Sequence, residues 1–222
     1  MIISHRHKFA YFRVPKTGSS TTEIILRLCG AIDRRDISTG HQTIGLPSYN
    51  IPEALAQKLS GSGFMEHMTP SLAIKYGLLT EQQLQEYHCV ATIRKPASRW
   101  RSALGHIGLV TPEDSIRMLE SKTSLPLEIL EVPQSEYFMY KDELVCEPLW
   151  FDILENEIKQ LMQSLGIKPL DDIPKLNASS IKKTDTPLSE FIPNHLRPAF
   201  QSRFKSDIKL YKHLFDKYRS EQ

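Results

Sequence analysis

Short apolar runs alternate with helical patterns along this chain, and this alternation limits the folds that it can adopt. Strand-like runs cover residues 9–14, 88–93 and about 147–151. Apolar residues recur at helical spacing over about 21–29, 80–87, 98–104 and 155–165. Strands that alternate with helices typically form a parallel sheet covered by helices. We therefore predict an α/β fold, in which residues 40–63 are the most loop-like part.

Composition gives little further direction. The 222 residues are 40% hydrophobic and 24% charged, which is ordinary for one soluble globular domain over residues 1–222. A net charge of +2 does not argue for a nucleic-acid partner. No segment resembles an export signal or approaches the roughly 18 apolar residues of a membrane span. We expect a cytoplasmic protein without a transmembrane segment, whose three widely spaced cysteines are reduced thiols.

Residues 13–21, RVPKTGSST, have the composition of an anion-binding loop. They end the first strand-like run and open a helical pattern. Gly18 lets the backbone approach a ligand closely, and the first N–H groups of a helix have no partner within the helix. Lys16 adds a positive charge, and hydroxyl groups follow it at Ser19, Ser20 and Thr21. An ordinary capped helix is the alternative, because Ser and Thr are also preferred caps.

This segment lacks the glycines of a nucleoside triphosphate loop. That loop has the pattern Gly, four residues, Gly, Lys, Ser or Thr. If Lys16 were its lysine, positions 10 and 15 would be glycine, but they hold Ala10 and Pro15. A ligand with fewer phosphates is therefore expected. A small-molecule or nucleoside kinase with an irregular phosphate loop is the alternative.

A second cationic loop follows the second strand-like run. Arg94 stands directly after the run, Pro96 enforces a turn, and Ser102 lies three residues beyond Arg99 on the next helical pattern. An arginine can hold a phosphate through two parallel hydrogen bonds, and a serine can complete the grip. Ligands of parallel sheets bind at the carboxyl ends of the strands. We therefore expect Lys16 and Arg94 at the same edge of the sheet.

Together the two loops resemble those of sulfotransferases that use 3′-phosphoadenosine 5′-phosphosulfate (PAPS), in the membrane-type carbohydrate branch that includes heparan sulfate 2-O-sulfotransferase. The family's first loop, Pro-Lys-Thr-(Gly/Ala)-Ser-(Ser/Thr), is matched by residues 15–20. Its second loop has Arg-x-Pro, then Arg and Ser, and is matched by Arg94, Pro96, Arg99 and Ser102. Later segments that resemble family elements follow in the same order, at residues 133–137, 149–167, 174–177 and 207–211.

The resemblance implies a three-layer sandwich with a central parallel sheet, the sulfotransferase fold that is similar to P-loop-containing nucleoside triphosphate hydrolases. It implies PAPS as the sulfate donor, held without a metal because lysine and backbone amides face a phosphosulfate. The implied donor-binding residues are Lys16, Thr17, Gly18, Ser19, Ser20, Thr21, Arg94 and Ser102. Lys16 is also implied as catalytic, since it would stabilise the departing phosphate oxygen.

The attacking hydroxyl requires a general base. Residues 63–69, GFMEHMT, resemble the segment that carries the catalytic histidine of heparan sulfate 2-O-sulfotransferase, which makes His67 the expected base. His41 and Glu66 remain alternatives. Residues Gln134, Ser135 and Tyr137 resemble a Gln-Ser-x-Tyr element and are expected near the 3′-phosphate or the acceptor, although a polar turn would have the same composition.

Two departures from the family pattern limit what the resemblance transfers. Lys95 stands where an acidic residue is usual, and the large insertions and the membrane anchor of animal members are absent. The first leaves the phosphate grip intact, and the second leaves the acceptor open. We expect a hydroxyl acceptor on a saccharide or glycan, and no nucleic acid. A catalytically silent nucleotide-binding protein of the same fold is a further alternative.

Overall fold

The computed structural model describes residues 1–40, 48–59, 65–121, 132–170 and 187–220. The chain divides into two compact units, each described by itself. Unit 1 comprises Met1–Ile93 and Glu136–Asn177, and unit 2 comprises Arg94–Ser135 and Ala178–Gln222. The expectation of one domain over residues 1–222 stays a prediction.

Unit 1 is built on a five-stranded mixed sheet in the order β3-β1-β2-β4-β7. Its strands are β1 (Ile2–Ser4), β2 (Phe9–Phe12), β3 (Ile37–Ser38), β4 (His88–Ile93) and β7 (Glu147–Trp150). The strands β2, β4 and β7 are parallel neighbours, while β1 runs antiparallel to both β2 and β3. The three strands expected from the sequence are confirmed, and the sheet is mixed rather than wholly parallel.

The antiparallel part arises because the chain reverses within a tight turn. Residues 5–8 connect β1 to β2, and Lys8 in this turn has a φ of 47°. Such a short connection can join only antiparallel strands, since a parallel pair needs a crossover of a dozen or more residues. The sequence did not predict β1, because this strand has only three residues and a basic turn follows it directly.

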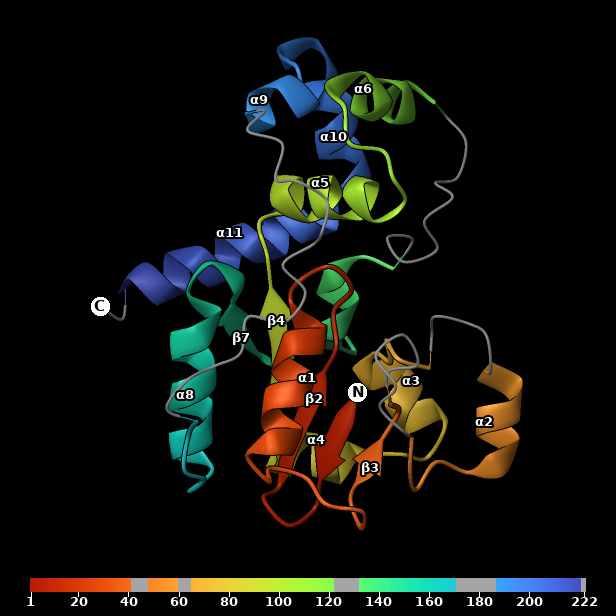
Figure 1. Cartoon of the computed structure of the whole chain (residues 1–222), viewed down its shortest axis with the longest axis vertical. Helices are drawn as coiled ribbons and strands as arrows, with labels where there is room; N and C mark the ends of the chain where they lie inside the picture. Colours follow the sequence, from red (N-terminus) through yellow and green to blue (C-terminus); the bar gives the residue numbers. More distant parts are fainter. Residues whose placement is uncertain (41–47, 60–64, 122–131, 171–186, 221–222) are drawn as a thin grey trace. The chain divides into compact units, whose positions relative to one another are not determined.

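Helices cover both faces of the sheet of unit 1. The helices α1 (Ser19–Leu28) and α8 (Leu154–Ser164) pack on the face that carries Phe9 and Tyr11, and Figure 1 looks onto this face. On the opposite face, the thiol of Cys89 donates to the carbonyl of Leu84 in α4 (Glu81–Glu86). Burial raises the pKa of the Cys89 thiol to about 12. Unit 1 therefore has an α/β fold, with a mixed sheet flanked by helices.

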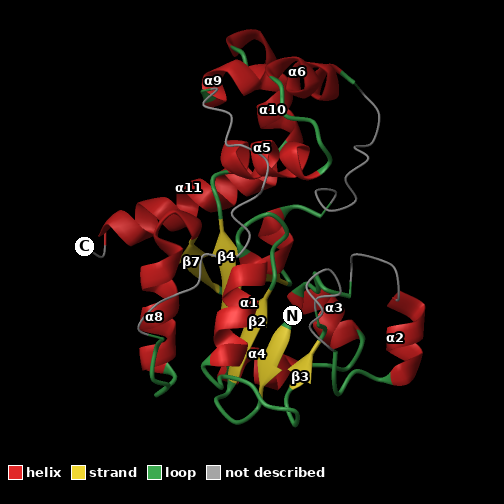
Figure 2. Ribbon diagram, viewed as in Figure 1, coloured by secondary structure: helices red, strands yellow, loops and turns green. Residues whose placement is uncertain are grey.

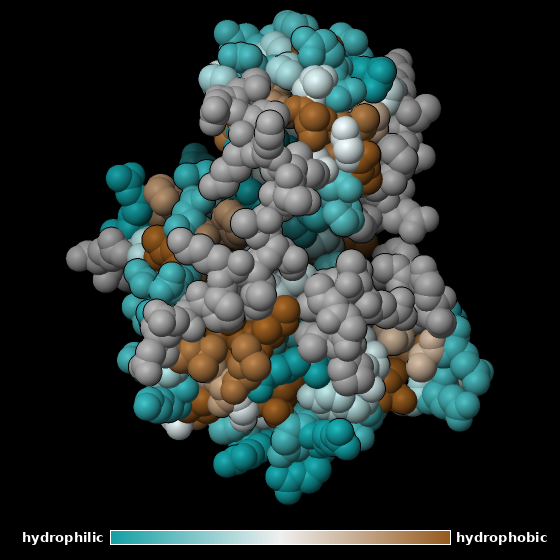
Figure 3. Space-filling view, viewed as in Figure 1, coloured by the Kyte–Doolittle hydropathy of each residue, from teal (hydrophilic) through white to brown (hydrophobic). Residues whose placement is uncertain are grey.

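The remaining elements of unit 1 are short. They are α2 (Glu53–Leu59), α3 (Pro70–Lys75), η2 (Gln134–Tyr137, which spans the boundary with unit 2), β5 (Met139–Tyr140), β6 (Glu143–Leu144) and η3 (Phe151–Ile153). The helix α2 corrects the expectation of a loop over residues 40–63. Its sequence, EALAQKL, consists of residues with high helix propensity and follows a proline. Figure 3 shows apolar side chains gathered between α1 and α8. Leu28, the last residue of α1, is exposed.

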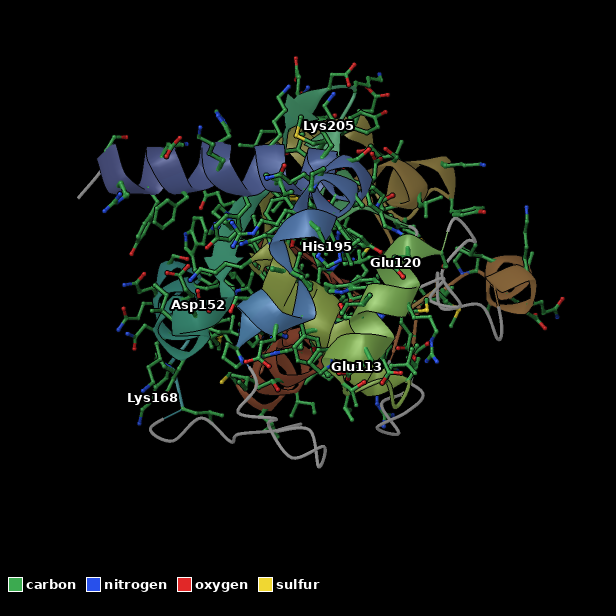
Figure 4. The ribbon with its side chains drawn as sticks, turned by 90° about the horizontal axis from the view of Figure 1, so that it is seen from above. Glu113, Glu120, Asp152, Lys168, His195 and Lys205 are labelled. Carbon is green, nitrogen blue, oxygen red and sulfur yellow. The ribbon has the colours of Figure 1, made fainter. Side chains whose placement is uncertain are left out.

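The described residues of unit 2 form helices and loops, without a strand (Figure 2). They form α5 (Pro96–His106), α6 (Pro112–Glu120), α9 (Leu188–Phe191), η4 (Asn194–Leu196), α10 (Arg197–Arg203) and α11 (Lys205–Ser220). Trp100 is fully buried in their apolar core, and its indole N–H donates to Ser115 Oγ at 2.8 Å. Figure 4 labels Glu113 and Glu120 near the two ends of α6, and Lys205 at the start of α11.

Candidate functional site

The loop between β2 and α1 has an unusual backbone. Lys16 has a φ of 64° and Gly18 a φ of 80°, so both residues are in the left-handed region. The hydroxyl of Thr17 donates to the carbonyl of Val14 at 2.8 Å and ties the loop to its own start. A left-handed residue other than glycine is uncommon and is found preferentially at functional sites. Lys8, in the turn before β2, has the same conformation, so the backbone of Lys16 alone does not distinguish this loop from an ordinary turn.

The first turn of α1 is capped by Gly18, which offers no side chain. Within the part of the chain that the structure describes, no side-chain hydrogen bond is found at this N-cap, and the first turn of α1 contains no acidic residue. The positive end of the helix dipole is therefore not balanced by an acid of its own turn. This differs from α3, whose Thr69 caps by accepting from the N–H of Leu72. The N-cap glycine leaves the first N–H groups of α1 without a cap from that residue, and the anion site stays a prediction.

Gly18→Ala is expected to lower the melting temperature by roughly 4–20 °C. A Cβ at Gly18 would lie 2.9 Å from Leu154 Cδ2 and 3.2 Å from Phe151 Cε2. The left-handed backbone costs a non-glycine residue about 1–2 kcal/mol, and overpacking adds about 1–3 kcal/mol; each kcal/mol shifts Tm by about 2–4 °C at this chain length. Thermal unfolding measures the effect.

Gly77→Ala is the matched control. Gly77 has a φ of 69°, but a Cβ there would meet no atom within 4 Å. The difference between the two variants isolates the contacts with Phe151 and Leu154. Equal melting temperatures would contradict the claim that these contacts make the loop intolerant of a Cβ.

His67 lies beside the strand that leads into the loop. Its Nδ1 is 2.8 Å from the carbonyl oxygen of Arg13, which directly follows β2. A carbonyl oxygen can only accept, so Nδ1 carries the proton, and in the neutral ring the basic lone pair is on Nε2. Arg13 precedes Lys16 by three residues, which span at most about 11 Å. The structure thus brings the expected base close to the loop that carries the expected lysine.

The two alternative bases have different outcomes. The Oε2 atom of Glu66 lies 3.9 Å from Nη1 of Arg13, so its carboxylate is part of an ion pair. His41 lies outside the described residues.

A buried cluster of charged side chains lies under this loop, and the sequence analysis did not identify it. The side chains of Arg13 and Glu23 are fully buried, with Nη1 and Oε2 2.7 Å apart. Arg27 also binds Glu23, through Nη2 at 2.8 Å and Nε at 3.2 Å. The sequence did contain one signal for this cluster, the charged residue Arg13 directly after a buried strand. A charge that is buried needs a partner of opposite charge, so a nearby carboxylate could have been expected.

In unit 2, both the backbone and the side chain of Arg94 make hydrogen bonds. The Arg94 N–H donates to Gln134 Oε1 at 3.4 Å, and Gln134 Nε2 donates to the Arg94 carbonyl at 3.0 Å. The Arg94 Nε donates to Ser98 Oγ at 3.1 Å. Ser102 lies one turn beyond Ser98 on the same face of α5. The side chain of Arg94 therefore contacts the face of α5 on which Ser102 lies.

Arg99 is engaged differently from Arg94. Its Nη1 donates to Asp207 Oδ2 at 2.9 Å, and both side chains are buried. The other carboxylate oxygen, Oδ1, accepts from the N–H of Ser135 at 3.3 Å. Burial raises the pKa of Asp207, while the charge of Arg99 opposes this shift. Asp207 thus links α11, α5 and the segment before Tyr137, a role that no local sequence pattern indicated.

The predicted site residues fall into two groups. Unit 1 contains Lys16, Thr17, Gly18, Ser19, Ser20, Thr21, Glu66, His67 and Tyr137, and the structure brings His67 near the loop at 16–21. Unit 2 contains Arg94, Ser102, Gln134 and Ser135. Gln134 and Tyr137 are almost completely buried, and the amide of Gln134 binds the backbone of Arg94. That both groups act on one ligand stays a prediction.

The described residues were also compared with what a membrane span and a metal site require. In the ranges that the structure describes, no helix is both long and apolar enough to cross a membrane. Nor do these ranges contain a group of three or more His, Cys, Asp or Glu side chains that could hold a metal ion. No family model matches this chain, and no match was found among the curated proteins or the solved structures compared with it.

Proposed function

We propose that this chain is a sulfotransferase, which moves a sulfuryl group from PAPS to an acceptor hydroxyl on a saccharide. The observation that carries the proposal is the position of His67, whose ring is anchored on Arg13 at 2.8 Å, next to a loop with Lys16 and an uncapped helix start. A base beside an anion-binding loop suits in-line transfer of a charged group to a hydroxyl. The order of the sequence motifs supports the same chemistry.

In the proposed reaction, the loop at residues 16–21 holds the 5′-phosphosulfate. The acceptor oxygen attacks sulfur, and the bond between sulfur and the bridging phosphate oxygen breaks. Negative charge gathers on that departing oxygen, and the Lys16 ammonium and the first N–H groups of α1 stabilise it. The products are the sulfated acceptor and 3′-phosphoadenosine 5′-phosphate (PAP).

His67 takes the proton of the acceptor hydroxyl on Nε2. The Nδ1–H bond to the Arg13 carbonyl supports this role, because it fixes both the tautomer and the orientation of the ring. Protonation at Nε2 leaves the Nδ1–H bond in place, since the imidazolium donates from both nitrogens. The base therefore does not need to rotate during the reaction.

The second loop is proposed to hold the 3′-phosphate through Arg94 and Ser102. In the sheet of unit 1, β2 and β4 are adjacent parallel strands with Phe12 opposite Ala91, so both strands end at one edge. Lys16 follows the first strand and Arg94 directly follows the second. We leave Arg99 out of the phosphate grip, because its guanidinium binds Asp207. The three-layer sulfotransferase fold belongs to the same proposal.

Arg94→Ala is expected to weaken PAP binding by about 10- to 100-fold. Hydrogen bonds to a charged group contribute about 1.5–3 kcal/mol, and each 1.4 kcal/mol is tenfold in affinity. Isothermal titration calorimetry without magnesium measures the dissociation constant. Lys95→Ala, which removes the neighbouring exposed cation, serves as the control and should change affinity by less than about 3-fold, as expected for a screened surface charge.

The same titration separates the alternatives. Unchanged PAP affinity in the Arg94 variant would remove Arg94 from the donor site, and no binding of PAP to the wild type would reject the sulfotransferase proposal. Stabilisation by ATP with magnesium, but not by PAP, would favour a kinase with an irregular phosphate loop. Binding of PAP without transfer of labelled sulfate to a panel of sugar, lipid and phenol acceptors would favour a catalytically silent protein of this fold.

A further inference from the structure

Arg13 contacts three separate segments of unit 1 with one buried guanidinium. Its Nη1 lies 2.7 Å from Glu23 Oε2 in α1 and 3.9 Å from Glu66 Oε2, and donates to the carbonyl of Gly40 at 2.9 Å. Its Nη2 is 3.5 Å from Ser20 Oγ in the first turn of α1. The backbone of the same residue accepts from His67. Arg13 thus touches both the segment with the base and the helix that the anion loop opens.

Stability alone does not explain this arrangement. A buried ion pair loses hydration that its attraction only partly restores, and an apolar pair of similar volume is often as stable or more stable. Moreover, Nε of Arg13 has no hydrogen-bond acceptor among the described residues, although the side chain is fully buried. An arginine that serves packing only would be replaceable here by an apolar residue.

The guanidinium of Arg13 attracts two carboxylates at once, which an apolar side chain cannot do. Glu66 precedes His67 in the sequence, so an attraction between Arg13 and Glu66 restrains the backbone that carries the histidine. Glu23 lies in α1 one turn beyond the hydroxyl residues of the loop, so the stronger attraction to Glu23 restrains the helix. Both restraints meet on one planar group, whose donors have fixed relative directions.

We propose that Arg13 is a positioning residue that fixes the imidazole of His67 relative to the first turn of α1. This inference rests on the proposed function for its catalytic consequence. Arg13 does not touch the reacting atoms; it acts through Glu66 and through its own carbonyl on His67, and through Glu23 on the helix. Without the guanidinium, the carbonyl of residue 13 remains but Glu66 loses its charged partner, so the ring of His67 is held less firmly on that carbonyl and Nδ1 carries the proton only part of the time.

The test is the double variant Arg13→Met/Glu23→Met, which removes one positive and one negative buried charge together. Arg27 loses Glu23 in this variant but is partly exposed and keeps Ser38 and the Tyr49 ring, so the melting temperature should fall by less than about 10 °C. Two-dimensional 15N–1H spectra of the imidazole rings, with the His67 signals assigned by their loss in His67→Asn, should show the Nδ1–H form in the wild type and a mixture of tautomers in the double variant. In sulfate transfer from PAPS, kcat should fall by about 10²-fold, the loss typical of a misplaced reacting group, while the dissociation constant of PAP changes by less than about 3-fold.

Two further variants keep the test decisive. Arg27→Met is the matched control, because it also removes an arginine that binds Glu23. The other contacts of Arg27 are with Ser38 and the Tyr49 ring, away from His67 in the sequence. In this variant His67 should keep its tautomer, and kcat should stay within about 3-fold of the wild type. Arg13→Lys keeps the charge without the fork, and should show the mixed tautomers even if the double variant does not fold. Wild-type spectra and kcat in the Arg13 variants would overturn the inference. The ring spectra need no donor, so a wild type that binds no PAP would reject the proposed function and leave this test standing.

Discussion

Under the proposed sulfotransferase function, His67→Asn is expected to lower kcat for sulfate transfer by about 10²- to 10⁴-fold, the usual contribution of a general base. Asparagine is chosen because its side-chain N–H can replace the Nδ1–H that donates to the Arg13 carbonyl at 2.8 Å, but it has no basic nitrogen. The anchor is therefore kept while the base is lost. Transfer of labelled sulfate at saturating PAPS measures kcat, and calorimetry measures the affinity for PAP.

Donor affinity distinguishes a catalytic role of His67 from a structural one. The His67→Asn variant should bind PAP within about 3-fold of the wild type, since the base contacts the acceptor and not the donor. The acceptor range is measured at the same time, because a base that acts on a hydroxyl should affect every acceptor alike. Equal losses in kcat and in PAP affinity would show that His67 supports the loop instead of accepting a proton.

Under the same proposal, Lys16→Met is expected to lower kcat by about 10²- to 10³-fold, the range found when one group that stabilises developing charge is removed from an enzyme. The change removes the ammonium and keeps a side chain of similar length on the left-handed backbone with φ 64°. Because charge on the departing oxygen is largest in the transition state, kcat should fall more than the affinity for PAP. Single-turnover transfer of labelled sulfate measures the chemical step directly.

Lys8→Met is the control for the lysine. Lys8 also has a left-handed backbone, with φ 47°, but it directly precedes β2 while Lys16 follows that strand. Loss of a lysine from the same backbone conformation at the other end of β2 should leave kcat within about 3-fold. A Lys16 variant as active as this control would exclude Lys16 from stabilising the departing group.

The elements that the sequence predicted correctly are those with strong local patterns. The runs that form β2 and β4 are almost entirely buried, and the continuous apolar residues of such strands are visible in the sequence. The helix patterns that became α1, α4, α5 and α8 have apolar residues at helical spacing. The short strands β1 and β3 and the helix α2 escaped prediction because few residues carry their signal.

For the candidate site, the sequence indicated residue types and the structure supplied their partners. Gly18 and Lys16 were recognised by composition, but the left-handed backbone of Lys16 could not be inferred from a lysine. Gln134 is expected near the 3′-phosphate or the acceptor, and the structure shows its amide bound to the backbone of Arg94; contact with a ligand stays a prediction. Arg99 was expected in a phosphate grip, and it pairs with buried Asp207, which lies 108 positions away.

By itself, the sequence determined the strand, loop and helix over residues 9–28, because the apolar spacing, the glycine and the hydroxyl residues that indicate them lie at neighbouring positions. Tertiary structure alone decided that Arg13 is buried between Glu23 and Glu66, and that His67 binds the Arg13 carbonyl from 54 residues away. The physical reason is that burial and pairing of a charge depend on which segments meet in the fold. No local pattern encodes which carbonyl a histidine ring will reach.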